Sequence, residues 1–227
     1  MFIIAAIAYA FSIFIDVSVY HFKYYIQDDK NTRHLLSLIN IFQYCSCGFI
    51  LIFIPIMAYT TESIKDKNEV WIITLLAHIL VILFLIPLYS SRFTSGFSIK
   101  IITLLNRFFG NSKPISLEAI NQRTKGKIQG FSNNWILFVT NYTAGFLFLI
   151  SITFLYYISF YFDQKALILS SLTQFINMFG SMLIILFIDP RIMGAIDDGG
   201  GENEIHILTS SRILVHITLV FILIFIK

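Results

Sequence analysis

Six apolar runs constrain this chain more than any other feature. Each is about as long as the roughly 20 residues that a helix needs to cross a bilayer. In lipid, a backbone satisfies its own hydrogen bonds only as a helix or in a closed barrel, and these runs are too long and too uniformly apolar for barrel strands. Hydrophobic residues make up 57% of the 227 residues and charged residues only 13%. The sequence therefore predicts an all-α polytopic membrane protein, a bundle of six transmembrane helices.

The predicted spans form a single integral membrane domain over residues 1–227. They cover residues 2–22, 35–59, 71–90, 135–162, 166–188 and 208–226. The first run has no basic region and no small-residue cleavage site, so we expect a retained span and not a removed signal peptide. Cys45 and Cys47 lie about 200° apart on the second span, so they do not converge on a metal. We expect them to be small residues buried in lipid.

The longest predicted loop, residues 91–134, has two parts. In FSIKIITLLNRFF, residues 97–109, the apolar positions lie on one helical face and Lys100 and Arg107 on the other. This spacing predicts an amphipathic helix in the membrane interface. The second part is basic, so the loop is expected to attract anionic membrane lipids. A sharper alternative is that some of its cations receive a lipid diphosphate. No nucleic-acid partner is expected.

Positive charge predicts the orientation. Twelve of the 16 Lys and Arg residues lie on the side of loops one, three and five. The other side holds Lys65, Lys67, Lys165 and Lys227. The positive-inside rule then places loops one, three and five in the cytoplasm and both termini outside.

Charged residues gather where the fifth and sixth spans meet. The fifth apolar run ends at Asp189-Pro190-Arg191, an acidic, glycine-rich turn is expected to follow, and Ser211-Arg212 begins the last run. The chain contains no P-loop, no H-E-x-x-H and no G-x-S-x-G motif, so we predict no catalytic residues, no metal and no cofactor. An open alternative is a membrane-embedded enzyme acting on a lipid diphosphate, with Mg²⁺ held by Asp197, Asp198 and Glu202.

Ionisable groups near membrane depth are the strongest site candidates. Charges within spans are costly and usually face a bundle interior or a wet cavity. Asp16 lies inside the first span, and Arg212 has His216 one turn deeper on the same face. The sequence is compatible with an Asp16–Arg212 pair if the first and last spans touch. The alternative for Arg212, Arg191 and Lys23 is that their side chains snorkel to the lipid headgroups.

Three segments, taken in order, resemble the Amj family, the alternate lipid II flippases of bacteria. They are VYHFKYYIQDDKNTRHLLSLINIF, NMFGSMLIILFIDPRIMGAIDD and SSRILVHITLVFI. The resemblance covers both ends of the chain, under half of its length. Lys23 stands where the family pattern has an arginine, and Val215 and His216 stand where it has Gly-Thr.

The resemblance implies a flippase that moves lipid II, or a related polyprenyl-diphosphate-linked oligosaccharide for cell-wall peptidoglycan, across the bacterial cytoplasmic membrane. It implies roles for Asp189, Arg191, Asp197 and Arg212. From the residues themselves, we expect Lys23 to help receive the diphosphate and Asp16 or His216 to couple to protons or to hold an arginine in place. We also expect a polar route along the fourth and fifth spans, lined by Asn141, Gln174 and Asn177.

Two further expectations follow from size and from the lack of catalytic motifs. A bundle of six helices is small for a wide cavity, which favours a homodimer. A non-transporting membrane scaffold subunit is a third interpretation of the same sequence.

Overall fold

The protein is a polytopic α-helical membrane protein, as predicted. The computed structural model describes residues 2–25, 32–109, 134–161 and 166–226. In these ranges the chain forms helices and no strands. Six helical stretches are long and apolar enough to cross a membrane: Phe2–Tyr25, Arg33–Ile64, Lys67–Tyr89, Trp135–Ser159, Ser171–Asp197 and Glu202–Ile226.

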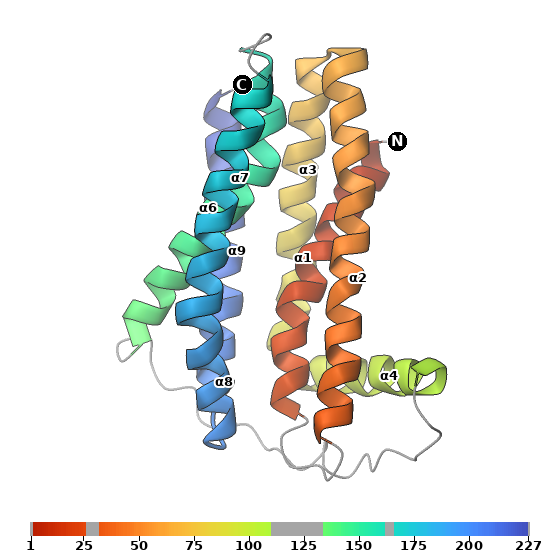
Figure 1. Ribbon diagram of the computed structural model, residues 1–227, viewed down its shortest axis with the longest axis vertical. Coiled ribbons are helices and arrows are strands. Elements are labelled where there is room, and N and C mark those ends of the chain that lie inside the picture. The colour runs from red at the N-terminus through yellow and green to blue at the C-terminus, as the bar shows by residue number, and fades with distance from the viewer. Residues whose placement is uncertain (1, 26–31, 110–133, 162–165, 227) are drawn as a thin grey trace.

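The six spans form two groups of three (Figure 1). The first group contains α1 (Phe2–Tyr25), α2 (Thr32–Tyr59) and α3 (Lys67–Leu85). The second contains α6 (Trp135–Ser159), α7 (Ala166–Leu183) and α9 (Glu202–Ile226). Within the groups, α1 packs on α2 and α3, and α6 packs on α7 and α9. The groups meet chiefly where α3 packs against α9. We call them the α1–α3 half and the α6–α9 half.

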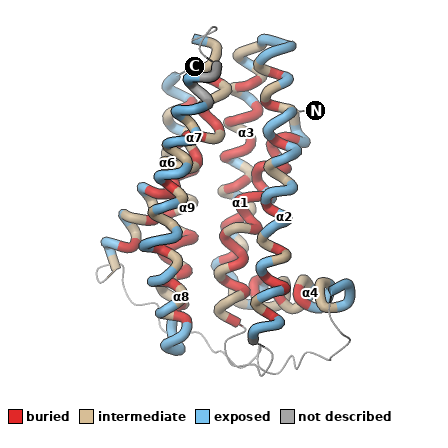
Figure 2. Tube along the Cα trace, in the orientation of Figure 1, coloured by how far each residue is buried: buried red, intermediate tan, exposed pale blue. Residues whose placement is uncertain are grey.

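Burial differs sharply among the spans (Figure 2). The most buried is α1, whereas α2 and α7 are the least buried. Small side chains explain the position of α1, because Ala5, Ala6 and Ala10 are fully buried and allow close approach of neighbouring helices. Tyr9 and Phe22 fill the space that remains. The outer faces of α2 and α7 are thus left for lipid.

The predicted interfacial helix is present as α4 (Ser91–Phe109), which lies across one end of the bundle (Figure 1). Its buried residues are Thr94, Ser98 and Ile102, and the Thr94 hydroxyl is 2.9 Å from the Tyr25 hydroxyl. On the other side, Arg107 and Phe108 are exposed. We call this end of the bundle the α4 end. The basic segment predicted to attract anionic lipid falls largely within residues 110–133, outside the described residues.

The span that contains α7 does not end at Asp189-Pro190-Arg191, so its predicted end was wrong: it continues to Asp197, and the acidic, glycine-rich turn follows at residues 198–201. A π-helical segment, η4 (Ile184–Ile188), leads directly into α8 (Asp189–Asp197). Proline lacks the backbone N–H and its ring crowds the carbonyl of the preceding turn, and a widened π-helical turn relieves both defects. Pro190 also occupies the first turn of α8, where proline is tolerated.

The last span begins at Glu202, earlier than the predicted residue 208. Glu202 and Glu204 lie in its first turn, where carboxylates interact favourably with the helix dipole. Because α9 begins earlier than predicted, Arg212 lies about 15 Å from the start of the helix, at 1.5 Å per residue. Arg212 is therefore well inside the helix and not at its beginning.

The turn between α8 and α9 requires glycine at two positions. The φ angles of Gly199 and Gly201 are +84° and +96°, in the region that side chains with a Cβ avoid. A Cβ on Gly201 would also lie 2.5 Å from Cγ1 of Ile196 and 3.1 Å from its backbone nitrogen. The glycine-rich composition of this turn is thus a backbone requirement.

We expect Gly201→Ala to destabilise the protein by about 1–3 kcal/mol, because it adds a strained φ and a clash with the backbone of α8. Thermal unfolding of the purified protein in detergent measures the effect. Gly194→Ala is the matched control, since a Cβ there meets nothing within 4 Å and alanine favours the interior of α8. Equal melting temperatures for the two variants would contradict this account.

Candidate functional site

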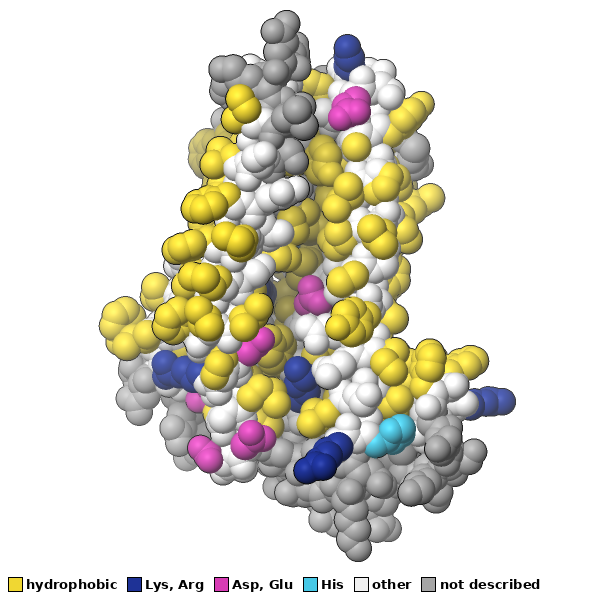
Figure 3. Space-filling view, viewed as in Figure 1, with side chains coloured by type: hydrophobic (Ala, Val, Ile, Leu, Met, Phe, Trp, Pro, Cys, Tyr) yellow, Lys and Arg dark blue, Asp and Glu magenta, His cyan; other side chains and the backbone are white. Residues whose placement is uncertain are grey.

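A cavity lies between the two halves of the bundle. Its volume is about 140 Å³, enough for several water molecules. The residues that line it come from α1, α2, α6, η4 and α9: Ile13, Asp16, Val17, Tyr20, Gln43, Phe148, Leu149, Ile184, Leu208 and Arg212. The space-filling view shows the molecule hollowed between α2 and α7 (Figure 3). The cavity thus adjoins the two spans that are least buried.

Asp16 and Arg212, two of the predicted site residues, both line this cavity. Asp16 comes from α1 and Arg212 from α9, and their charges act on each other. The two described side chains do not form a direct ion pair within 4 Å. The Ser46 side chain of α2 also acts on the Asp16 carboxylate. The cavity lining therefore contains one cationic side chain, from α9, and one acidic side chain, from α1, and the cavity separates the helices that carry them.

Arg212 is positioned by a glycine on the facing helix. A Cβ on Gly145 of α6 would lie 2.5 Å from Nη1 of Arg212, 3.3 Å from Cζ and 3.4 Å from Cδ. The guanidinium therefore lies directly over the backbone of α6. Any other residue at position 145 would occupy the place of the arginine.

We expect Gly145→Ala to move the guanidinium. If the cargo is a diphosphate lipid, as the sequence resemblance implies, its affinity should fall by about tenfold, or about 1.4 kcal/mol. Stability should change little, because the end of an arginine side chain is flexible. Gly48→Ala on α2 is the control, since its Cβ would meet nothing within 4 Å. Binding of a fluorescent prenyl diphosphate to both variants checks the prediction, and equal affinities would refute it.

The side of the cavity nearer the α4 end is bordered by a polar contact between α1 and α8. The Tyr20 hydroxyl donates a hydrogen bond to Oδ1 of Asp189. The Lys23 ammonium lies 5.5 Å from the centre of the Tyr20 ring. Asp189 and Lys23, both predicted site residues, are therefore joined to the cavity lining through Tyr20.

Arg191 has a different environment. Its Nη2 atom donates to Oδ1 of Asn134 at 2.8 Å, and Nδ2 of Asn134 donates to Oε1 of Glu204 at 3.0 Å. This chain connects α8, the start of α6 and α9. Arg191 is exposed and does not line the cavity. Asp197 is exposed at the end of α8.

The three residues predicted to form a polar route lie outside the cavity lining. Asn141 of α6 is fully buried, and neither its Nδ2 nor its Oδ1 has a hydrogen-bond partner among the described residues. Asn177 of α7 is half-buried, and Gln174 is exposed. The structure does not bring these side chains together with Asp16 and Arg212.

His216 is fully buried and bonds to another histidine. Its Nδ1 is 2.9 Å from Nδ1 of His78 on α3. This pairing was not predicted, because the two residues lie on different spans and no local sequence pattern indicates which spans pack together. Tyr20, Gln43 and Ser46 were also missed, since a single polar residue in a span does not indicate which neighbour it faces.

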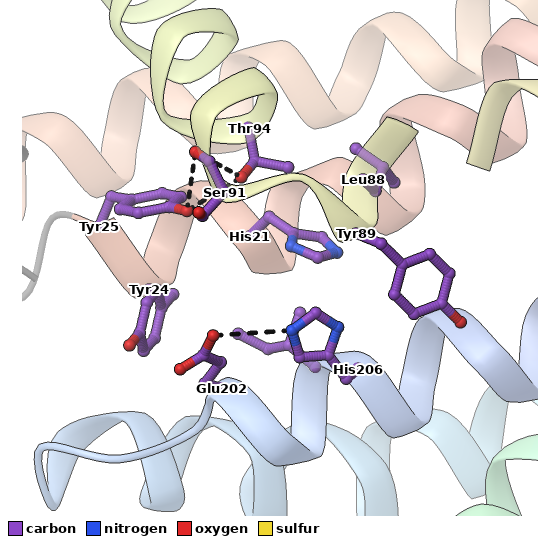
Figure 4. A pocket seen from close by; sticks show the side chains of 10 residues that line it. His21, Tyr24, Tyr25, Leu88, Tyr89, Ser91, Thr94, Glu202 and His206 are labelled. Carbon is purple, nitrogen blue, oxygen red and sulfur yellow. Dashed lines mark hydrogen bonds and ion pairs between the residues drawn. The ribbon is translucent and has the colours of Figure 1, made fainter. Parts of the chain in front are cut away.

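A smaller pocket lies between α1, α4 and α9 at the α4 end (Figure 4). Its volume is about 20 Å³, room for about one water molecule. Nε2 of His21 is 3.0 Å from the Thr209 hydroxyl, and Nε2 of His206 is 3.7 Å from Oε1 of Glu202. The His21–Thr209 contact joins α1 to α9, whereas the Glu202–His206 contact lies within the first turns of α9.

The proposed Mg²⁺ ligands of the enzyme alternative lie in the α8–α9 region. Among the described residues, no three or more His, Cys, Asp or Glu side chains are arranged to hold a metal ion. Asp197, Asp198 and Glu202 therefore do not converge. Cys45 and Cys47 are free thiols on the exposed surface of α2.

The fold and the cavity define the class as a multi-pass α-helical membrane protein with a charged cavity between two groups of three spans. Comparisons with protein-family models, with curated proteins and with solved structures found no match.

Proposed function

We propose that this protein is a flippase that moves a polyprenyl-diphosphate-linked glycan, such as a lipid II-like cell-wall precursor, from the inner to the outer leaflet of a bacterial cytoplasmic membrane. The observation that carries the proposal is the cavity between the halves, with Arg212 and Asp16 in its lining. A polar headgroup does not cross hydrocarbon unaided, because each unpaired polar group costs several kcal/mol. A cavity that offers a cation inside the bundle supplies the missing partner.

Arg212 is the residue that we assign to the diphosphate. A guanidinium binds phosphate oxygens in a bidentate manner and keeps its charge when it is desolvated. Lys23 lies near the same cavity through Tyr20, so it can attract the headgroup on its way in. Asp16 acts on the charge of Arg212, so an arriving diphosphate competes with this carboxylate and is held reversibly.

The position of the cavity suits a lipid cargo. It adjoins α2 and η4, which belong to different halves, and α2 and the span of α7 have the largest lipid-facing surfaces. A polyprenyl chain could stay in the bilayer while its diphosphate enters between these helices. The cavity of about 140 Å³ has no room for a glycan. The proposal therefore requires the α1–α3 half and the α6–α9 half to separate during transport.

The charge distribution supports an orientation with the α4 end in the cytoplasm. Lys23, Lys100, Arg107 and Arg191 belong to this end, and the basic segment 110–133 connects its elements in the sequence. The positive-inside rule favours the cytoplasm for such an end. The exposed cations of α4 would then face anionic lipid headgroups, and the cargo would enter from the leaflet where precursors are made.

The test is leaflet exposure in cells that depend on this gene. Cells that lack other flippases are depleted of the protein, and outward-facing, labelled lipid-linked glycan is measured with an impermeant enzyme. We expect exposure to stop while the precursor accumulates inside. Normal exposure after depletion would reject the proposal. Purified protein in proteoliposomes, with a fluorescent short-chain lipid-linked disaccharide, separates transport from an effect on synthesis.

A further inference from the structure

Two histidines from different halves of the bundle meet near its centre. His78 lies on α3 and His216 on α9, with their Nδ1 atoms 2.9 Å apart. Tyr9 of α1 packs edge-on against both rings, at centroid distances of 5.7 Å and 6.3 Å. All three side chains are fully buried. The contact of α3 with α9 is the main one between the halves, so this cluster lies where the halves are held together.

The bond between the rings determines where their protons lie. An Nδ1–Nδ1 hydrogen bond between neutral rings needs one ring protonated on Nδ1 and the other on Nε2. One Nε2 is then an N–H donor and the other a basic lone pair. Among the described residues, neither Nε2 atom nor the Tyr9 hydroxyl has a hydrogen-bond partner. The pair therefore keeps an unused basic nitrogen inside the bundle.

A proton is the ligand that this geometry accepts. Two nitrogens bound to one tetrahedral metal ion at about 2.0 Å lie about 3.3 Å apart, whereas 2.9 Å is a hydrogen-bond length. One added proton leaves the Nδ1–Nδ1 bond intact and makes it charge-assisted. A second proton would place donors on both Nδ1 atoms and break the bond. The pair should therefore bind one proton and not two.

Among the described charged side chains, Arg212 is the one that acts on the pair, and it does so at His216. It lies one helical turn from His216 on α9, and its charge acts on His216 and on Tyr9. From α1, Asp16 acts in turn on Arg212. In the described part of the chain, no charged side chain of α2, α3 or α6 acts on either histidine. A cationic Arg212 opposes a cationic pair, and an anion bound to Arg212 removes this opposition.

We propose that His78, His216 and Tyr9 form a proton-binding site that fills when an anion neutralises Arg212. The inference rests on the proposed function in one respect, namely that the anion is the diphosphate of the cargo. Binding of the anion and the proton is then coupled, and by linkage each raises the affinity for the other by the same factor. A proton gradient across the membrane would give the transport its direction.

The experiment measures the protonation of the two rings directly. Full-length protein labelled with ¹⁵N-histidine is placed in nanodiscs of phosphatidylcholine and phosphatidylglycerol, and NMR spectra are recorded from pH 4 to pH 9. Nitrogen chemical shifts separate protonated from unprotonated ring nitrogens. His78→Gln and His216→Gln assign the signals of the pair. Arg212→Gln removes the opposing charge, and Asp16→Asn/Arg212→Gln also removes the carboxylate left without its cation.

In Arg212→Gln, we expect the pair to bind one proton at least ten times more tightly than in the wild type. Removing a positive neighbour favours the protonated form, so the half-protonation pH should rise by at least one unit. The double variant should shift in the same direction by a smaller amount. The inference is overturned if the pair stays neutral from pH 4 to pH 9 in both variants. It is also overturned if each histidine takes up a proton of its own.

Inorganic pyrophosphate distinguishes this inference from the proposed function. Added to the wild type, it should raise the half-protonation pH as Arg212→Gln does, which would support both proposals. If pyrophosphate and a prenyl diphosphate fail to bind while Arg212→Gln still shifts the pair, the diphosphate site is rejected and the proton site stands. Binding of pyrophosphate without any change at the histidines would reject the proton site as proposed.

Discussion

Arg212→Gln is expected to reduce transport of a lipid-linked glycan by at least about 100-fold. The cavity would keep its shape but lose the cation that we assign to the diphosphate. Glutamine can offer only neutral hydrogen bonds, which are about half as strong as those between ionised groups. The measurement is the initial rate of transport in proteoliposomes at matched protein content. Arg212→Lys should retain part of the rate, since it keeps the charge but not the bidentate geometry.

Two controls separate charge from folding in this experiment. Arg107→Gln on the exposed face of α4 removes an arginine outside the cavity and should transport at the wild-type rate. Removing Arg212 alone also leaves Asp16 without its cation, which is destabilising in a desolvated site. Asp16→Asn/Arg212→Gln should therefore recover stability and not transport. A double variant that transports normally would show that Arg212 is not the diphosphate site.

Cross-linking the two halves across the cavity is expected to stop transport completely and reversibly. Gln43 on α2 and Ile184 on η4 line the cavity from opposite halves. Cysteines at both positions, joined by a bifunctional thiol reagent with a reducible spacer, would prevent the halves from separating. Because the cavity has no room for a glycan in the described structure, a locked protein cannot pass its cargo. Reduction of the spacer should restore the rate.

The cross-linking can be done in a variant without other cysteines. The two native cysteines, Cys45 and Cys47, are exposed on α2, so alanine at both positions should be tolerated. The variants with a single cysteine at position 43 or 184 should be unaffected by the reagent. If the cross-linked double variant transports at the uncrosslinked rate, the cargo does not pass between the halves.

The spans could be predicted because membrane insertion is decided locally. Each apolar run must satisfy its own backbone hydrogen bonds in lipid, so its length and composition are sufficient to indicate a helix. The interfacial helix α4 was predictable for the same reason, because its 3.6-residue periodicity is a local pattern. The error at Pro190 has a local cause too. Proline usually ends a helix, but here the π-helical η4 accommodates it.

The candidate site was only partly predictable. Asp16 and Arg212 stood out because charges inside apolar runs are costly, and the structure brings both to one cavity. The predicted depth of Arg212 was wrong, because carboxylates in the first turn of α9 extended the helix beyond the apolar run. Asn141 and Gln174 were predicted to line a polar route because they are polar residues within spans, yet they lie outside the cavity lining.

By itself, the sequence determined that this chain is an all-α membrane protein with six helices apolar enough to cross the bilayer, and it indicated which ionisable groups need a partner inside it. Only the tertiary structure decided that the spans form two groups of three with a cavity between them. It also decided that Gly145 of α6 lies beneath Arg212, and that His78 bonds to His216. The physical reason is that every span has an apolar surface compatible with lipid. Which spans become neighbours therefore depends on side-chain packing between helices that are distant in the sequence.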